Sequence, residues 1–233
     1  MGVNGMENRV DYGKILEKTL AEIDTRAVKP TLLLHACCAP CSSYTLEYLS
    51  PHFRQIDVFF YNPNISPESE YETRLAELKR LTTEAPYDCP IAVIAGRYEP
   101  ERFFEMARGL EELAEGAARC YLCYEMRLRE TARMARDGGY DYFTTTLSIS
   151  PYKNAVWLNE IGAQTAAETG GVYLTSDFKK RGGYQRSIAL SREYGLYRQD
   201  FCGCVYSARD AEKRRAAAGE QKQDTVTREP VSD

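Results

Sequence analysis

The segment Thr31-Leu-Leu-Leu-His-Ala-Cys-Cys-Ala-Pro-Cys-Ser42 joins an apolar run directly to three closely spaced cysteines. The apolar residues predict a buried strand over 31–35, and the helical pattern that follows extends through Leu49. The cysteines therefore occupy the turn from strand to helix. In an open α/β sheet this turn lies at the carboxyl end of the strand, where ligands bind.

Strands and helices alternate along the rest of the chain. Further strands are predicted over 56–61, 91–95 and 140–144, with a short candidate over 172–174. Helices are predicted over 12–26, 101–108 and 121–136, and two more are expected to begin at Ser66-Pro67 and Ser150-Pro151. This alternation predicts an α/β protein with a Rossmann-like three-layer fold and a mostly parallel sheet.

Length and composition are those of a soluble globular protein with one core. The chain has 233 residues, of which 43% are hydrophobic and 27% charged, and it has no apolar run of signal-peptide or membrane-span length. We expect a single domain over 1–215, a disordered tail over 216–233 and a cytoplasmic location. Because that compartment is reducing, eight cysteines favour metal binding or redox catalysis over a disulfide framework.

The positive charge is concentrated near the carboxyl end. The whole chain carries −4, yet residues 179–215 hold ten Lys or Arg against four Asp or Glu. This asymmetry can direct a polyanion to one face, although a solvated helix face explains part of it equally well. Arg186 and Arg198 alternate with tyrosines, a mixture suited to phosphate contacts and base stacking, while tyrosines packed on a core are the competing explanation.

Seven of the eight cysteines fall into three clusters: Cys37, Cys38 and Cys41, then Cys120 and Cys123, then Cys202 and Cys204. Thiolates from the first two clusters fit tetrahedral zinc or an iron–sulfur cluster. Adjacent cysteines have diverging side chains, which suit the separate corners of a cubane better than one zinc ion. Spacing alone leaves an iron–sulfur cluster, structural zinc and unrelated buried thiols open.

The third cluster has a different geometry, because a single glycine separates Cys202 from Cys204. A disulfide closed over so short a loop is readily reduced, which suits a two-electron relay. Metal ligation together with the other clusters is the alternative for this pair. The isolated Cys89, beside Pro90, is interpreted as a buried or incidental thiol.

Six ordered segments closely resemble the QueH family of epoxyqueuosine reductases over residues 30–207. They are LLLHACCAPCSS (32–43), FYNPNISPESEYETR (60–74), RCYLCYEMRL (119–128), DYFTTTLSISPYKN (141–154), DFKKRGGYQRSIALS (177–191) and LYRQDFCGCVYS (196–207). The resemblance implies an oxidoreductase of tRNA processing that works without cobalamin. It would reduce the epoxide of epoxyqueuosine at the tRNA wobble position to queuosine, the last step of queuosine biosynthesis.

The resemblance also implies roles for individual cysteines. Cys202 and Cys204 would form a redox-active disulfide, and a second metal ion, such as iron, is suggested beside the cluster. For this second metal we take Cys41 and Asp177 as candidate ligands. The [4Fe-4S] cluster itself would be held by Cys37, Cys38, Cys120 and Cys123.

The expected partners are tRNA carrying epoxyqueuosine and an external electron donor, with no membrane. Epoxide removal requires two electrons and protonation of the departing oxygen, and Cys202, Cys204, Tyr152 or a bound water could deliver a proton. A metal with an open position could act as a Lewis acid on the C–O bond. The residues expected to meet the tRNA or the substrate are Lys179, Lys180, Arg186 and Arg198.

Two other functions compete with this interpretation. A PP-loop tRNA-thiolating enzyme would also combine an α/β fold, cysteines and RNA, but it needs a glycine-rich pyrophosphate loop after the first strand. Here the cysteines occupy that turn, so ATP has no evident site. A zinc-stabilised RNA-binding module is the non-enzymatic alternative.

Overall fold

The protein is described by a computed structural model over residues 10–226, with side chains as far as Ala217. One sheet contains four parallel strands in the order β3-β2-β1-β4. The strands are β1 (Thr31–His35), β2 (Gln55–Phe60), β3 (Ile91–Ala95) and β4 (Tyr142–Thr145). The α-helices are α1 (Tyr12–Asp24), α2 (Ala39–Leu49), α3 (Glu68–Glu84), α4 (Pro100–Ala107), α5 (Ala118–Asp137), α6 (Ala155–Thr169), α7 (Gly183–Glu193) and α8 (Val205–Val226). Two 3₁₀ turns, η1 (Ser50–His52) and η2 (Thr146–Ile149), complete the order.

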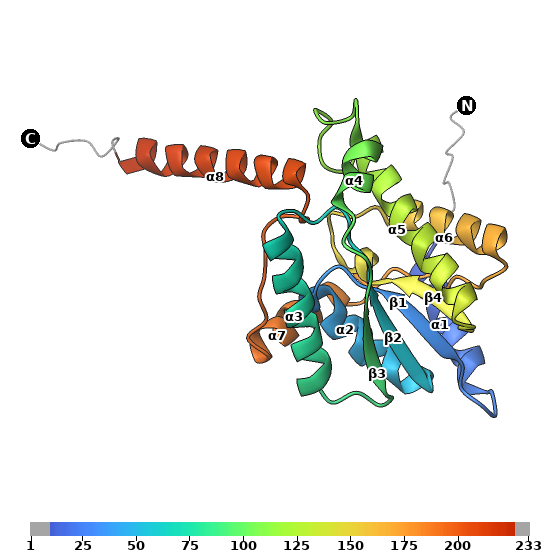
Figure 1. The fold of residues 1–233 in the computed structure, drawn as a ribbon. Helices are drawn as coiled ribbons and strands as arrows, with labels where there is room; N and C mark the ends of the chain where they lie inside the picture. Colours follow the sequence, from blue (N-terminus) through green and yellow to red (C-terminus); the bar gives the residue numbers. More distant parts are fainter. Residues whose placement is uncertain (1–9, 227–233) are drawn as a thin grey trace, which may run out of the picture.

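Helices cover both faces of the sheet, and strand side chains alternate between them. Leu32 and Leu34 of β1 pack into the core beneath α1, α2 and α3, whereas Leu33 packs into a second core beneath α5 and α6. All five residues of β1 are buried, as expected for a parallel strand covered on both sides. The three-layer α/β fold expected from the sequence is confirmed (Figure 1).

Two helix starts differ from the expectation. Helix α3 begins at Glu68 with Pro67 at its N-cap, and the backbone N–H of Ser66 donates instead to Gly203 O at 3.0 Å. Helix α6 begins only at Ala155, because the Asn154 side chain accepts from the N–H groups of Val156 and Trp157. Ser150 ends η2 and does not cap a helix.

The prediction of a strand over 172–174 is wrong. This segment forms an isolated bridge between Tyr173 and Phe143, with Phe143 N–H donating to Val172 O and Leu174 N–H donating to Phe143 O. The bridge extends the sheet beyond β4 by one residue only. The short apolar run nevertheless packs on the core, since Leu174 is fully buried.

The expected boundary of the domain at Ala216 lies inside a helix. Helix α8 starts directly after the third cysteine cluster, points away from the α/β body and continues to Val226 (Figure 1). The alanines at 216–218 have the highest helix propensity, so the helix has no local reason to stop at residue 215. The disorder of the tail stays a prediction, and its last residues, 227–233, lie outside the described part of the chain.

Candidate functional site

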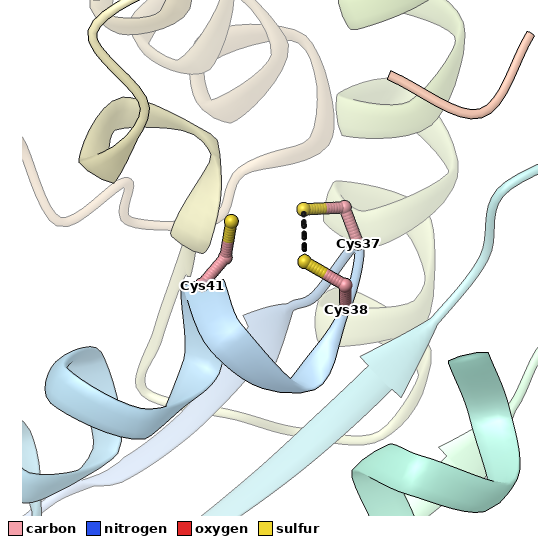
Figure 2. Close-up of side chains that lie close together, drawn as sticks. All are labelled: Cys37, Cys38 and Cys41. Atoms are coloured by element: carbon pink, nitrogen blue, oxygen red, sulfur yellow. Dashed lines mark hydrogen bonds between the residues drawn. The ribbon is translucent and has the colours of Figure 1, made fainter. Parts of the chain in front are cut away.

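The first cysteine cluster lies at the carboxyl end of the central strand β1. Cys37 and Cys38 form the turn between β1 and α2, and Cys41 follows one helical turn later. The three sulfur atoms lie within 4.8 Å of one another and point into a common space (Figure 2). Because thiolates bind zinc, copper(I) and iron–sulfur clusters, this group can bind a metal.

Neighbouring strand ends hold the backbone of this turn in place. The buried His35 donates from Nε2 to Tyr61 O at 3.1 Å and accepts at Nδ1 from Thr145 Oγ1 at 2.8 Å. Burial, with the nearby Arg127 as the second cause, lowers the pKa of His35 to about 3, so the ring is neutral. Asn62 Nδ2 donates to Ala36 O at 2.8 Å. The ends of β1, β2 and β4 are thereby tied together under the cysteines.

The three clustered thiols do not ionise together. Hydrogen bonds from Cys38 and Cys41 hold the pKa of Cys37 well below its usual value. The same contact with Cys37 raises the pKa of Cys38 to about 12, and the hydrogen bonds to Cys37 and Cys38 raise the pKa of Cys41. Cys37 is therefore the most acidic of the three thiols. A bound cation would stabilise the thiolate form of all three.

The second cluster occupies the first turns of α5. Cys123 is buried, and burial raises its pKa to about 12. Burial also raises the pKa of Cys120, whose sulfur accepts from the N–H of Gly116 at 3.2 Å. Both residues line a small cavity together with Cys202 and Cys204. The second and third clusters thus face the same space.

The third cluster precedes α8 and is fixed by its glycine. Gly203 has φ = +116°, and a Cβ there would lie 2.9 Å from Ile65 Cγ1 and 3.0 Å from Arg74 Nη1. Arg74 Nη1 also donates to Cys202 O at 3.0 Å. Both the backbone angle and the close packing require glycine between these cysteines.

A larger cavity of about 780 Å³ opens beside the first cluster. Its lining includes all three cysteines of that cluster and also Cys202, which lines the smaller cavity as well. Cys202 is therefore the thiol common to both spaces. Basic and aromatic side chains complete the wall of the larger cavity, among them Tyr152, Lys153, Arg198, Arg214 and Arg215.

Buried cations surround the cysteines. Arg127 is 1% exposed, donates to Asn62 Oδ1 at 3.1 Å and to Cys123 O at 3.3 Å, and has no hydrogen-bond partner at Nη2. Among the residues that the structure describes, no carboxylate lies within 4.0 Å of Arg127. A buried cation with only neutral partners is costly, so this arrangement fits an anionic occupant such as a thiolate-bound metal group.

Of the basic residues expected to meet tRNA, the structure brings Arg198 to the large cavity. Arg186 forms a two-pronged ion pair with Glu47, at 2.9 and 2.6 Å, and Lys180 is exposed. Lys179 Nζ lies 3.0 Å from Asp177 Oδ1. Asp177 is buried but does not belong to the group of metal-binding side chains around Cys41.

Two buried cations near the thiols were missed by sequence reasoning. Arg127 follows Cys123 by four residues, so helical periodicity could have placed both on one face of α5. Lys153 is close to Cys202 only through the fold, at a sequence separation of 49 residues. No local pattern could have found it.

No helix within residues 10–226 combines the length and apolar character needed to cross a membrane.

Comparison with known proteins identifies the family. A family model described as "Epoxyqueuosine reductase QueH" matches residues 32–210. The protein of that name from Staphylococcus epidermidis is 42% identical over 204 residues, which cover 86% of this chain and 85% of the relative. The one from Streptococcus pyogenes is 40% identical over 203 residues, which cover 86% of this chain and 79% of the relative. The relative from Thermotoga maritima is 36% identical over 189 residues, covering 80% of this chain and 94% of its own length. The chain belongs to the QueH family of epoxyqueuosine reductases.

Proposed function

We propose that this protein reduces the epoxide of epoxyqueuosine, at the wobble position of tRNA, to the cyclopentene of queuosine. Its family and its relatives carry the name of this oxidoreductase activity. The reaction takes up two electrons and two protons and releases the epoxide oxygen as water. The observation that carries the proposal is the convergence of three cysteine segments on two cavities that share Cys202.

A [4Fe-4S] cluster is the cofactor that we propose for Cys37, Cys38, Cys120 and Cys123. When bound, such a cluster supplies single electrons. Cys37 and Cys38 precede α2, and Cys120 and Cys123 lie in the first turns of α5, so two pairs of thiols are available as donors. Among the described residues the close group of thiols comprises Cys37, Cys38 and Cys41 and does not include the α5 pair. The unpartnered guanidinium nitrogen of Arg127 gives independent support, since an anionic cluster would compensate its charge.

A second metal beside the cluster remains part of the proposal. Cys41 supports it, because its sulfur is within 4.8 Å of both Cys37 and Cys38. Asp177 has a weaker claim, since its Oδ1 atom already pairs with Lys179 at 3.0 Å. A metal with an open position there would supply Lewis acidity toward an oxygen atom.

The large cavity is the proposed site for the wobble nucleoside. Its volume of about 780 Å³ lies in the range of small-molecule sites, which is roughly 300–1,000 Å³. Tyr152 at its wall is 79% exposed and offers a free ring on which a base could stack. Arg198, Arg214 and Arg215 add positive charge for the flanking phosphates. Cytoplasmic tRNA is therefore the proposed partner.

Cys202 and Cys204 are proposed to alternate between dithiol and disulfide, with an external reductant restoring the dithiol. Two thiols that form a disulfide release two electrons, which is the number that one epoxide requires. Both are free thiols in the structure, and a single glycine separates them in the sequence. The proposed proton donors are these thiols, Tyr152 and water.

The test is conversion of the modified tRNA under anaerobic conditions. The iron-loaded, reduced protein is incubated with tRNA containing epoxyqueuosine, and the nucleosides are quantified by mass spectrometry. We expect queuosine to accumulate. A matched control is Cys89→Ala, which removes a thiol that lines neither cavity and should convert the tRNA as the wild type does. Absence of queuosine with an effective electron donor, from protein whose iron content is full, would refute the proposed function.

A further inference from the structure

Lys153 makes a direct contact with one of the two cysteines of the CxC pair. Its ammonium Nζ donates to Cys202 Sγ at 3.1 Å, and its side chain is only 9% exposed. The residue lies in the turn before α6, where the Lys153 N–H donates to Ser150 O at 3.2 Å. The Lys153 side chain thus places an ammonium group in direct contact with the Cys202 sulfur.

The other groups around Lys153 are weaker partners. The nearest carboxylate is that of Glu115, at 3.9 Å and 25% exposed, and the Tyr124 ring centroid lies 5.9 Å away. Arg127 approaches from α5 and adds a second positive charge to the same region. Cys202 Sγ is therefore the closest group that can carry a negative charge against this ammonium.

Cys204 has different surroundings, although it is only two residues away. It is buried, and its sulfur accepts from the N–H of Ser207 at 3.4 Å and lies 3.5 Å from Ser207 Oγ, in the first turn of α8. Burial raises the pKa of Cys204, with the neighbouring Cys202 as the second cause. Cys204 lines only the smaller cavity, whereas Cys202 also faces the large one. The two cysteines thus differ in their polar contacts and in their access to the large cavity.

We propose that Lys153 is a positioning residue of the CxC pair, which makes Cys202 the sulfur that exchanges with the external reductant and Cys204 the buried resolving thiol. This inference rests on the proposed role of the pair as a redox couple.

The exchange with a dithiol reductant can be written in two steps. A donor thiolate attacks the Cys202 sulfur, the Cys202–Cys204 bond breaks, and Cys204 leaves and takes up a proton. The second thiolate of the donor then attacks the donor sulfur that is bonded to Cys202. Cys202 leaves as a thiolate opposite Lys153. The donor becomes a disulfide and loses two electrons, which reside in the reduced CxC pair.

The test compares Lys153→Met with Lys153→Arg in the full-length, iron-loaded protein. Lys79→Met is the matched control, because Lys79 is an exposed lysine on α3. The reduced proteins are treated with iodoacetamide at neutral pH, and fragment mass spectrometry assigns the alkylation to Cys202 or Cys204. The midpoint potential of the pair is measured in parallel in dithiol redox buffers.

We expect the wild type to alkylate faster at Cys202 than at Cys204. Lys153→Met should slow alkylation of Cys202 about tenfold, whereas Lys153→Arg and Lys79→Met should stay within about threefold of the wild type. Because the ammonium stabilises the reduced form, its loss should lower the midpoint potential by about 30 mV, which is a tenfold change for a two-electron couple.

Alkylation of Cys202 at the wild-type rate in Lys153→Met would overturn the inference, as would a wild-type protein in which Cys204 reacts first. Misfolding of Lys153→Met would change the alkylation rates of Cys202 and Cys204 equally, and Lys153→Arg would then fail to restore the wild-type rate. This outcome also counts against a positioning role for Lys153. These readouts need no tRNA. A wild-type protein with the expected thiol asymmetry but no queuosine formation would refute the proposed function alone.

Discussion

Replacement of the buried Arg127 by methionine separates a structural role of this guanidinium from a role in binding an anionic metal group. The side chain makes two hydrogen bonds, to Asn62 Oδ1 and to Cys123 O, and is 1% exposed. Each acceptor left without a donor costs roughly 1–3 kcal/mol. Burial of an uncompensated charge costs several kcal/mol in the wild type, and the substitution removes that cost. The two effects oppose each other in the metal-free protein.

We therefore expect the unfolding free energy of metal-free Arg127→Met to stay within about 2 kcal/mol of the wild-type value. Iron binding should respond differently, because the group that compensates the charge of the cluster is lost. Loss of such a supporting interaction typically weakens metal affinity by about 10–100-fold. The substitution should thus leave the fold largely intact and weaken the binding of iron.

The assays are urea unfolding of the metal-free proteins and iron and sulfide analysis after anaerobic reconstitution against a competing chelator. Arg129→Met is the control, because Arg129 lies on the same helix but is partly exposed and pairs with Glu125. The reasoning is refuted if Arg127→Met retains iron as well as Arg129→Met does. It is also refuted if metal-free Arg127→Met loses more than about 4 kcal/mol, since the guanidinium would then support the fold itself.

Three further predictions concern other parts of the molecule. Cys120→Ala should abolish retention of the cluster, whereas Cys204→Ala should retain the cluster but stop turnover. Iron analysis measures cluster retention, and conversion of the modified tRNA measures turnover. Loss of iron in both variants would mean that Cys202 and Cys204 are metal ligands. Gly203→Ala should destabilise the protein by about 1–3 kcal/mol in urea, because its φ is +116° and Ile65 is close; unchanged stability would contradict this packing. Thr31 N–H and Oγ1 donate to the Asp141 carboxylate and lower its pKa, so the contribution of Asp141 to stability is complete above about pH 4 and is lost as pH falls through its folded-state pKa. Asp141→Asn should therefore reduce the loss of stability on acid titration. An unaltered dependence of stability on pH in the acid range would contradict this.

Local sequence patterns were sufficient for the central part of the fold. The apolar run of β1 and the cysteine turn after it depend on neighbouring residues only, and the structure has β1 over Thr31–His35 as expected. Signals that compete locally were harder to interpret. Asn154 caps α6 in preference to Ser150, and Tyr173 pairs with a single residue of β4, because tertiary packing determines how far each element extends.

The candidate site was predictable only where its residues are close in sequence. The three clusters were visible as CCxxC, CxxC and CxC patterns, but their mutual arrangement was not. The structure groups Cys41 with Cys37 and Cys38, and it brings Cys202 to both cavities. The lysine next to Cys202 comes from a different turn, so only the topology of the chain makes them neighbours.

Buried positive charge links the two proposed redox elements. Arg127 donates to the Cys123 carbonyl between the first and second clusters, and Lys153 contacts the Cys202 sulfur between the two cavities. An electron added to either proposed element would create negative charge near these cations. Each cation would therefore stabilise the reduced form, because opposite charges attract more strongly where water is largely excluded. A protein that must accept electrons from a donor and hold them until a substrate arrives requires this sign of charge around its thiols.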